Sequence, residues 1–169
     1  MRRILTSLAG FCVFAAVALA APQARAQQAP TDLTELYHNW QQTQDPEQII
    51  ALGEQLLTLE PSATAWPLTV ERAQVKAEVQ FGVGSAYVGR QRGIRSENLE
   101  KAIAHLQAAL IVFTRERDPQ VWGRAQNNIG IAYWGRIQGE RADNQENAIA
   151  HFEQALAIFS RETAFLIAS

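Results

Sequence analysis

The sequence contains one cysteine, Cys12, and two lysines, Lys76 and Lys101, in 169 residues. Cys12 lies in an N-terminal segment that we expect to be removed, so the mature protein would have no disulfide and no cysteine-ligated metal. Only 19% of the residues are charged, whereas 47% are apolar, a balance typical of a globular protein. Its stability must therefore come from the packing of apolar side chains.

The first 26 residues have the layout of a secretory signal peptide. Arg2 and Arg3 form a positive start, an apolar stretch runs from Ile4 to Ala21, and residues 24–26 (Ala-Arg-Ala) supply a small-x-small cleavage pattern. We predict cleavage after Ala26, a flexible leader over residues 27–30, and a periplasmic or secreted location. The alternative is an uncleaved membrane anchor, because about eighteen apolar residues just span a bilayer.

The predicted mature chain is mildly acidic. Removal of residues 1–26 takes away three arginines and no acidic residue, so the net charge changes from −2 to about −5. Phosphate groups bind to basic surfaces, so this charge argues against nucleic acid as the main partner. After cleavage we also expect no contact with a membrane.

The second half of the chain contains an internal repeat. Residues 80–116 and 126–162 align with a shift of 46 residues, and about half of the aligned positions are identical. Identity at this level over one fixed shift indicates two copies of a structural unit. The identical pairs include Tyr87/Tyr133, Arg90/Arg136, Arg95/Arg141, Asn98/Asn144, Glu100/Glu146 and His105/His151.

Each copy is predicted to form two helices joined by a long turn. In the last unit the first helix is expected from about Gln120 to Ile137, and Gly139 with its neighbours ends it. Asp143 and Glu146 have the spacing of a capping box that would start the second helix. The second helix carries an apolar stripe at helical spacing, formed by Ala148, Ile149, Phe152, Ala155, Leu156 and Phe159.

These two units resemble the tetratricopeptide repeat (TPR). Its pattern places a glycine three residues before a tyrosine on the first helix, and Ala-x3-Phe-x2-Ala on the second. Residues 129–133 and 148–155 follow this pattern, and residues 83–87 and 102–109 follow it nearly as well. The step from tyrosine to alanine is 15 residues here instead of about nine, so the resemblance is to the extended bacterial variety with a long inter-helix turn.

A weaker unit precedes these two. Leu36, Trp40 and Leu56 fall at the spacings of an ordinary short TPR, but Gly53 stands at the large-residue site and Ile49 at a small-residue site. A packed interior tolerates such an exchange because the total volume is conserved. The resemblance implies an all-α fold, a right-handed α-solenoid of about three helix-turn-helix units near residues 31–64, 66–118 and 119–169.

No pattern of an enzyme active site is present. The glycine-rich residues 82–90 lack the spacing of a phosphate-binding loop, and their repeat counterpart is helical in pattern. His105 and His151 occupy equivalent places in two units and His38 lies in the first, so we expect structural histidines rather than metal ligands or catalytic groups. We predict no enzyme, no metal and no cofactor; the alternative is a hydrolase whose polar cluster the sequence does not reveal.

Charged residues recur at fixed places in the repeat. We expect the arginines to brace the long turn and the start of the second helix. On this hypothesis Arg141→Ala lowers the melting temperature, whereas the alternative is a binding site for an acidic partner. The recurring residues are Arg90/Arg136, Arg95/Arg141 and Glu100/Glu146.

The TPR resemblance implies binding of another protein. In such arrays the first helices line a concave face, and the matching positions here are Thr34, His38, Gln41, Phe81, Ser85, Val88, Arg124, Asn127, Ile131 and Trp134. This mixed apolar and amide-bearing surface suits an extended or helical peptide. Phe81 and Trp134 are the anchor candidates because aromatic residues dominate interface energetics; burial of Trp134 against a neighbouring helix is the alternative. We predict an exported adaptor or scaffold.

The C-terminal end of the chain is apolar, from Ala164 to Ser169, where repeat arrays usually have a polar cap. This end would fold back, pair with another copy, or reflect a truncated reading frame. It also supports an alternative function, that of a non-catalytic assembly or regulatory subunit docking through its C-terminal helix.

Overall fold

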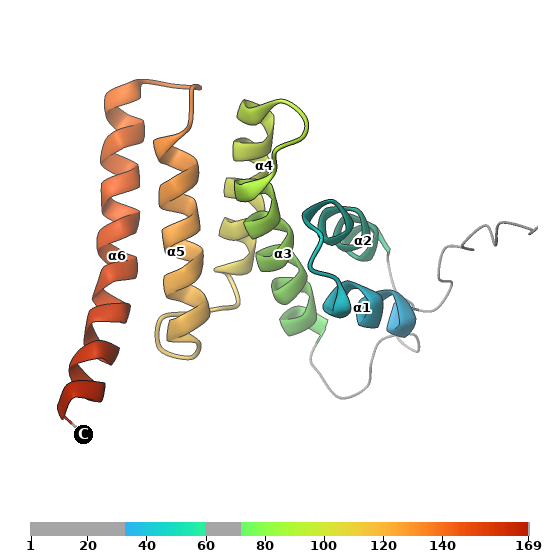
Figure 1. Cartoon of the computed structure of the whole chain (residues 1–169), viewed down its shortest axis with the longest axis horizontal. Helices are drawn as coiled ribbons and strands as arrows, with labels where there is room; N and C mark the ends of the chain where they lie inside the picture. Colours follow the sequence, from blue (N-terminus) through green and yellow to red (C-terminus); the bar gives the residue numbers. More distant parts are fainter. Residues whose placement is uncertain (1–32, 60–71, 169) are drawn as a thin grey trace, which may run out of the picture.

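The computed structural model describes residues 33–59 and 72–168, with side chains up to residue 160 (Figure 1). The predicted signal peptide (1–26) and leader (27–30) lie outside these residues. The described part contains six helices and no strand, which confirms the all-α class. The helices are α1 (Leu33–Gln42), α2 (Pro46–Thr58), α3 (Arg72–Gly89), α4 (Arg95–Ala109), α5 (Pro119–Trp134) and α6 (Arg141–Ala168).

The six helices follow one another in space as they do in the chain. Each helix packs against the next one in sequence, and α3 also contacts α5. Figure 1 shows α6 at one end of the molecule and the α1–α2 pair at the other. Two helices fall within each predicted unit. Within the described residues, no helix has the length and apolar character needed to cross a bilayer.

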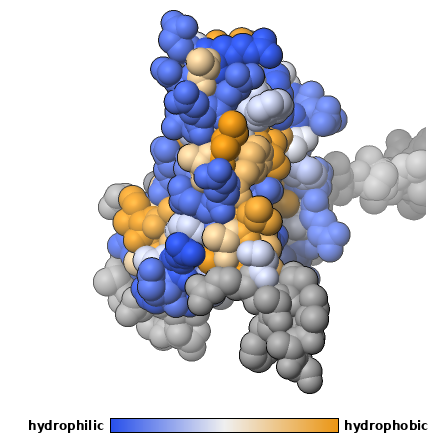
Figure 2. All heavy atoms as spheres, turned by 90° about the vertical axis from the view of Figure 1, so that its left-hand side faces the viewer, coloured by the Kyte–Doolittle hydropathy of each residue, from blue (hydrophilic) through white to orange (hydrophobic). Residues whose placement is uncertain are grey.

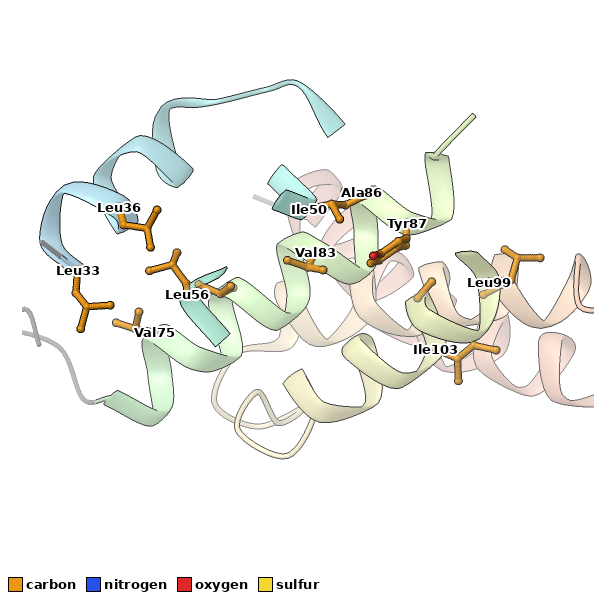
Figure 3. Packing of buried hydrophobic residues seen from close by; sticks show 13 residues of the cluster. Leu33, Leu36, Ile50, Leu56, Val75, Val83, Ala86, Tyr87, Leu99 and Ile103 are labelled. Carbon is orange, nitrogen blue, oxygen red and sulfur yellow. The ribbon is translucent and has the colours of Figure 1, made fainter. Parts of the chain in front are cut away.

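The largest group of buried apolar residues joins α1, α2 and α3 and continues onto α4 (Figure 3). Leu36, Val75, Val83 and Leu99 are fully buried. Burying a side chain of this kind contributes roughly 1.5–3 kcal/mol to the free energy of unfolding. Since cysteine cross-links are not available here, this apolar contact holds the first unit against the second.

Two glycines make room for the indole of Trp40. A Cβ atom added at Gly53 would lie 3.1 Å from Trp40 Nε1 and 2.2 Å from a methyl group of Val83. A Cβ added at Gly82 would lie 2.4 Å from the indole ring. The indole N–H donates to the carbonyl of Ile49 at 3.2 Å. Trp40 and Val83 therefore fill the space where the TPR pattern has a large residue at the Gly53 site.

A close contact between glycine and an apolar residue recurs in the two similar units. In the second unit, a Cβ added at Gly84 would lie 2.7 Å from Leu106 Cγ. In the third, a Cβ added at Gly130 would lie 2.7 Å from the ring of Phe152. These pairs let the two helices of each unit approach closely, as the sequence pattern predicts.

The predicted bounds of the helices in the last unit were wrong by a few residues. Helix α5 ends at Trp134 rather than near Ile137, and α6 already begins at Arg141. Gly139 has φ of 77°, a left-handed conformation that turns the chain early. The predicted capping box is also wrong, because Asp143 lies inside the first turn of α6 and so cannot occupy the N-cap position.

Candidate functional site

The predicted groove residues of α3 are in contact with α5. The guanidinium of Arg124 lies 5.4 Å from the ring centroid of the half-buried Phe81. The Asn128 side-chain amide donates to the hydroxyl of Ser85 at 2.9 Å. Val88 packs against the apolar clusters at the same helix pair. Phe81, Ser85 and Val88 therefore help to join the second unit to the third.

Residues further along α5 face solvent. Trp134 is 63% exposed and Ile131 is 38% exposed, whereas Asn127 is half-buried. The predicted exposure of Trp134 is confirmed, and its burial against a neighbouring helix is wrong. Arg124 and Trp134 are ten residues apart, or about 15 Å along the helix axis, so the candidate surface has two separate ends. On α1, Thr34, His38 and Gln41 are also exposed.

A hollow of about 330 Å³ lies at the Phe81 end of this surface. Most of its walls are apolar, so it suits an aliphatic or aromatic side chain. Glu78 is the one acidic residue among the described lining residues, and its carboxylate accepts a hydrogen bond from the hydroxyl of Tyr37 at 2.5 Å. Burial and this bond raise the pKa of Tyr37. The lining residues are Trp40, Gln41, Thr43, Ile49, Glu78, Phe81, Gly82, Phe113 and Val121.

A second hollow, of about 400 Å³, lies at the Trp134 end. Its walls come from the end of α5, the turn that follows, and the first residues of α6. The exposed side chains of Trp134 and Ile137 give this hollow an apolar part, and the exposed Arg141 gives it a positive part. It therefore suits a partner segment that carries both an apolar residue and a carboxylate.

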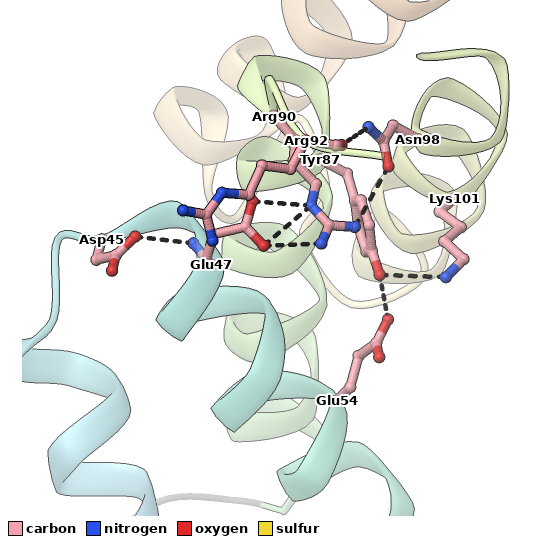
Figure 4. Close-up of polar contacts among 8 residues, drawn as sticks. All are labelled: Asp45, Glu47, Glu54, Tyr87, Arg90, Arg92, Asn98 and Lys101. Atoms are coloured by element: carbon pink, nitrogen blue, oxygen red, sulfur yellow. Dashed lines mark hydrogen bonds and ion pairs between the residues drawn. The ribbon is translucent and has the colours of Figure 1, made fainter. Parts of the chain in front are cut away.

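Two recurring arginines join neighbouring units, and Figure 4 shows the first of them, Arg90, with Glu47 and Asn98. Arg90 at the end of α3 donates from Nη2 to Glu47 of α2 at 2.7 Å. Arg136 makes the corresponding contact one unit later, from Nε to Glu100 of α4 at 2.7 Å. The bond from Arg90 holds the pKa of the Glu47 carboxyl below its usual value. The arginines therefore reach back to the preceding unit, a contact that the repeat pattern did not predict.

The long turns are held by asparagine. The Asn98 amide donates to the carbonyl of Arg92 at 2.7 Å, and the Asn144 amide donates to the carbonyl of Gln138 at 2.8 Å. Arg136 also donates to Asn144 Oδ1 at 3.3 Å, so one guanidinium contacts both the turn and the preceding unit. These contacts favour the bracing interpretation over a site for an acidic partner at these residues.

The two remaining repeat arginines differ from each other. Arg95 donates to the carbonyl of Val88 at 2.6 Å and so ties the start of α4 to the end of α3. Arg141 is exposed and lines the second hollow. The bracing expected of Arg141 is made by Arg136 instead.

Both repeat histidines are packing residues. His105 stacks on Tyr87 with ring centroids 5.8 Å apart, and its Nδ1 lies 2.6 Å from Gln80 Oε1. His151 stacks on Tyr133 in the same way, at 5.5 Å. Burial lowers the pKa of both imidazoles, which keeps them neutral. Nowhere in the described residues do three or more histidine, cysteine, aspartate or glutamate side chains gather as a metal site would require.

Seven residues of the first hollow were not among the predicted groove positions, namely Trp40, Thr43, Ile49, Glu78, Gly82, Phe113 and Val121. They come from α1, α2, α3, α5 and the turns after α1 and α4, so only the packing of these elements brings them to one opening. Comparison with protein-family models, curated proteins and solved structures gave no match for this chain.

Proposed function

We propose that this chain is an exported, non-enzymatic interaction module of the TPR type. Its three helix pairs form a short right-handed solenoid, and the first helix of each pair lines the binding face. A peptide or helix of a partner protein lies along this face. The observation that carries the proposal is the apolar hollow whose lining includes two of the predicted groove residues, Gln41 and Phe81.

The two ends of the face suit two anchor residues of one partner segment. An apolar side chain enters the hollow between Trp40 and Phe81, and a second one contacts the exposed ring of Trp134. Along α5 the step from Arg124, which lies over Phe81, to Trp134 is about 15 Å, which corresponds to about ten residues of helix or about five residues of extended chain. Aromatic anchors in such pockets supply most of the binding energy of an interface.

A selection from a peptide library displayed on phage tests this proposal, with residues 27–169 as bait. Selected peptides are expected to share two apolar residues at one of these two spacings. Trp134→Ala should weaken their binding about tenfold, the consequence of losing roughly 1.4 kcal/mol. Ile111→Ala is the matched control, because Ile111 is exposed on the turn after α4 and lies outside both hollows.

Equal binding by the Trp134→Ala and Ile111→Ala variants would move the site away from α5. N-terminal sequencing of the protein recovered from the periplasm tests the export step separately. A mature chain that begins at Gln27 is expected, and one that still begins at Met1 contradicts cleavage.

A second candidate function is supported by the exposure of apolar side chains on α6. Ile149 and Leu156 belong to the predicted apolar stripe of this helix, and they are 52% and 64% exposed. Such a face favours an assembly subunit that docks through its last helix.

A further inference from the structure

The outer face of α6 corresponds to a face that is covered elsewhere in the same molecule. With the shift of 46 residues, Ile149 and Leu156 of α6 correspond to Ile103 and Leu110 near the end of the preceding unit. Ile103 is 7% exposed and Leu110 is partly buried, because α5 packs on this side of α4. Among the described helices, only α5 contacts α6, and it packs on the other side of it. Figure 2, which views the molecule from the α6 side, shows apolar surface surrounded by hydrophilic residues.

The face also carries the carboxylate of the ion pair that joins consecutive units. Glu47 accepts from Arg90 of the next unit, and Glu100 accepts from Arg136 of the next unit. Glu146 is the corresponding carboxylate of α6, and it is exposed without an ion pair among the described residues. The face therefore combines an apolar stripe with a carboxylate at the place where each unit receives an arginine.

We infer that the outer face of α6 is a docking site for the first helix of a further repeat unit on a partner protein. That helix presents alanine- or glycine-sized residues to Ile149 and Leu156, as Ala125 and Ala132 of α5 do in the clusters shared with α4. Near its end it carries an arginine that binds Glu146. The inference deepens the second candidate function and involves none of the residues proposed to hold a peptide.

A second copy of this chain is a poor occupant of the same face. In a head-to-tail pair the helix laid on α6 would be α1, and its described residues include no arginine or lysine. Trp40 stands three residues after Tyr37, where the other units have arginine three residues after tyrosine. The exposed side chains of α1 are polar, namely Thr34, Glu35, His38, Asn39, Gln41 and Gln42. Helix α1 therefore offers neither an apolar surface for Ile149 and Leu156 nor a basic side chain for Glu146.

The docking inference can be tested by adding one further repeat unit to the chain. Duplication of residues 115–160 directly after residue 160 adds one repeat period, because Arg161 and Glu162 correspond to Arg115 and Glu116. It also restores Pro119 after the second helix, where the present chain has Phe165 and α6 continues to Ala168. We expect the extended chain to unfold in one transition at a higher temperature than the original chain.

Glu146→Gln distinguishes docking on this face from a general effect of length. In the extended chain this change should lower the melting temperature by about 2–4 °C, because it removes one arginine contact. In the original chain it should leave the melting temperature unchanged. An equal effect in both chains, or two separate unfolding transitions, overturns the inference.

Sedimentation of the original chain tests the choice of occupant. A monomer over the whole accessible concentration range is expected, whereas a dimer that Ile149→Glu abolishes would assign the face to self-association. In either case the Trp134→Ala peptide experiment is unaffected, so failure of this inference and failure of the groove proposal are distinguishable.

Discussion

Arg136 at the end of α5 donates to both carboxylate oxygens of Glu100 on α4, at 2.7 Å from Nε and 3.0 Å from Nη2. The two side chains are 27% and 30% exposed, so the pair is partly shielded from solvent. This bond raises the pKa of the Arg136 guanidinium. Because the pair joins consecutive units, it acts on the fold as a whole rather than on one hairpin.

Arg136→Ala should therefore destabilise the protein by about 1 kcal/mol, and Arg141→Ala should have a smaller effect. The first change removes the bonds to Glu100 and Asn144, whereas the second removes an exposed side chain. Urea unfolding of the two variants measures the difference in their free energies of unfolding, provided that these depend on urea concentration with the same slope. If Arg141→Ala proved the more damaging change, the assignment of the brace to Arg136 would be wrong.

The close approach of α3 and α4 depends on the absence of a side chain at Gly84. An added Cβ would lie 2.7 Å from Leu106 Cγ, 3.1 Å from the Leu106 backbone nitrogen and 3.2 Å from the Ala102 carbonyl oxygen. Backbone atoms cannot move aside, so Gly84→Ala should cost about 1–3 kcal/mol. Gly89→Ala is the control, since nothing lies within 4 Å of a Cβ there.

Gly130→Ala should cost less than Gly84→Ala, because its Cβ meets the ring of the half-buried Phe152 and not backbone atoms. Thermal unfolding of the three alanine variants gives the order directly. A Gly89→Ala variant as unstable as Gly84→Ala would mean that the close contacts of Gly84 do not explain its loss of stability, because alanine favours a helix more than glycine does.

The sequence was most informative where residue size and spacing decide the structure. The Gly130–Phe152 contact and the Tyr133–His151 stack recur one period earlier as Gly84–Leu106 and Tyr87–His105. It was less informative about partners across units. The pairing of Arg136 with Glu100 rather than Glu146 depends on where α5 lies against α4, and a repeat pattern alone contains no such information.

The stability of the fold should decrease as the pH falls below about 6.5, the usual pKa of histidine. Burial lowers the pKa of His105 and His151 in the folded chain, so the unfolded chain takes up protons first. The contribution of the two neutral rings to the free energy of unfolding is fully present above the pKa of histidine in the unfolded chain. It is lost as the pH falls toward the lower pKa values of the folded chain. Near His105, Glu54 and Lys101 act in opposite directions on this shift.

Urea midpoints at about pH 7.5 and about pH 5.5 measure this decline. The double variant His105→Gln, His151→Gln should show a smaller difference between the two midpoints, whatever its absolute stability. An unchanged difference would assign the acid sensitivity to carboxylates instead.

The long turns require a left-handed residue at Gly93 and Gly139, where φ is 79° and 77°. An alanine in this conformation costs about 1–2 kcal/mol because its Cβ approaches the following carbonyl oxygen. Gly139→Ala should therefore destabilise the third unit by this amount. Gly139→Asn should cost less, since asparagine tolerates left-handed backbone better than alanine does.

If the two variants were equally unstable, crowding at the turn rather than its backbone conformation would explain the glycine. Space is available, however, because the nearest atom to an added Cβ is Arg136 Nη1 at 3.8 Å. Equal losses from Gly93→Ala and Gly139→Ala would show that both turns contribute alike to holding consecutive helices in place.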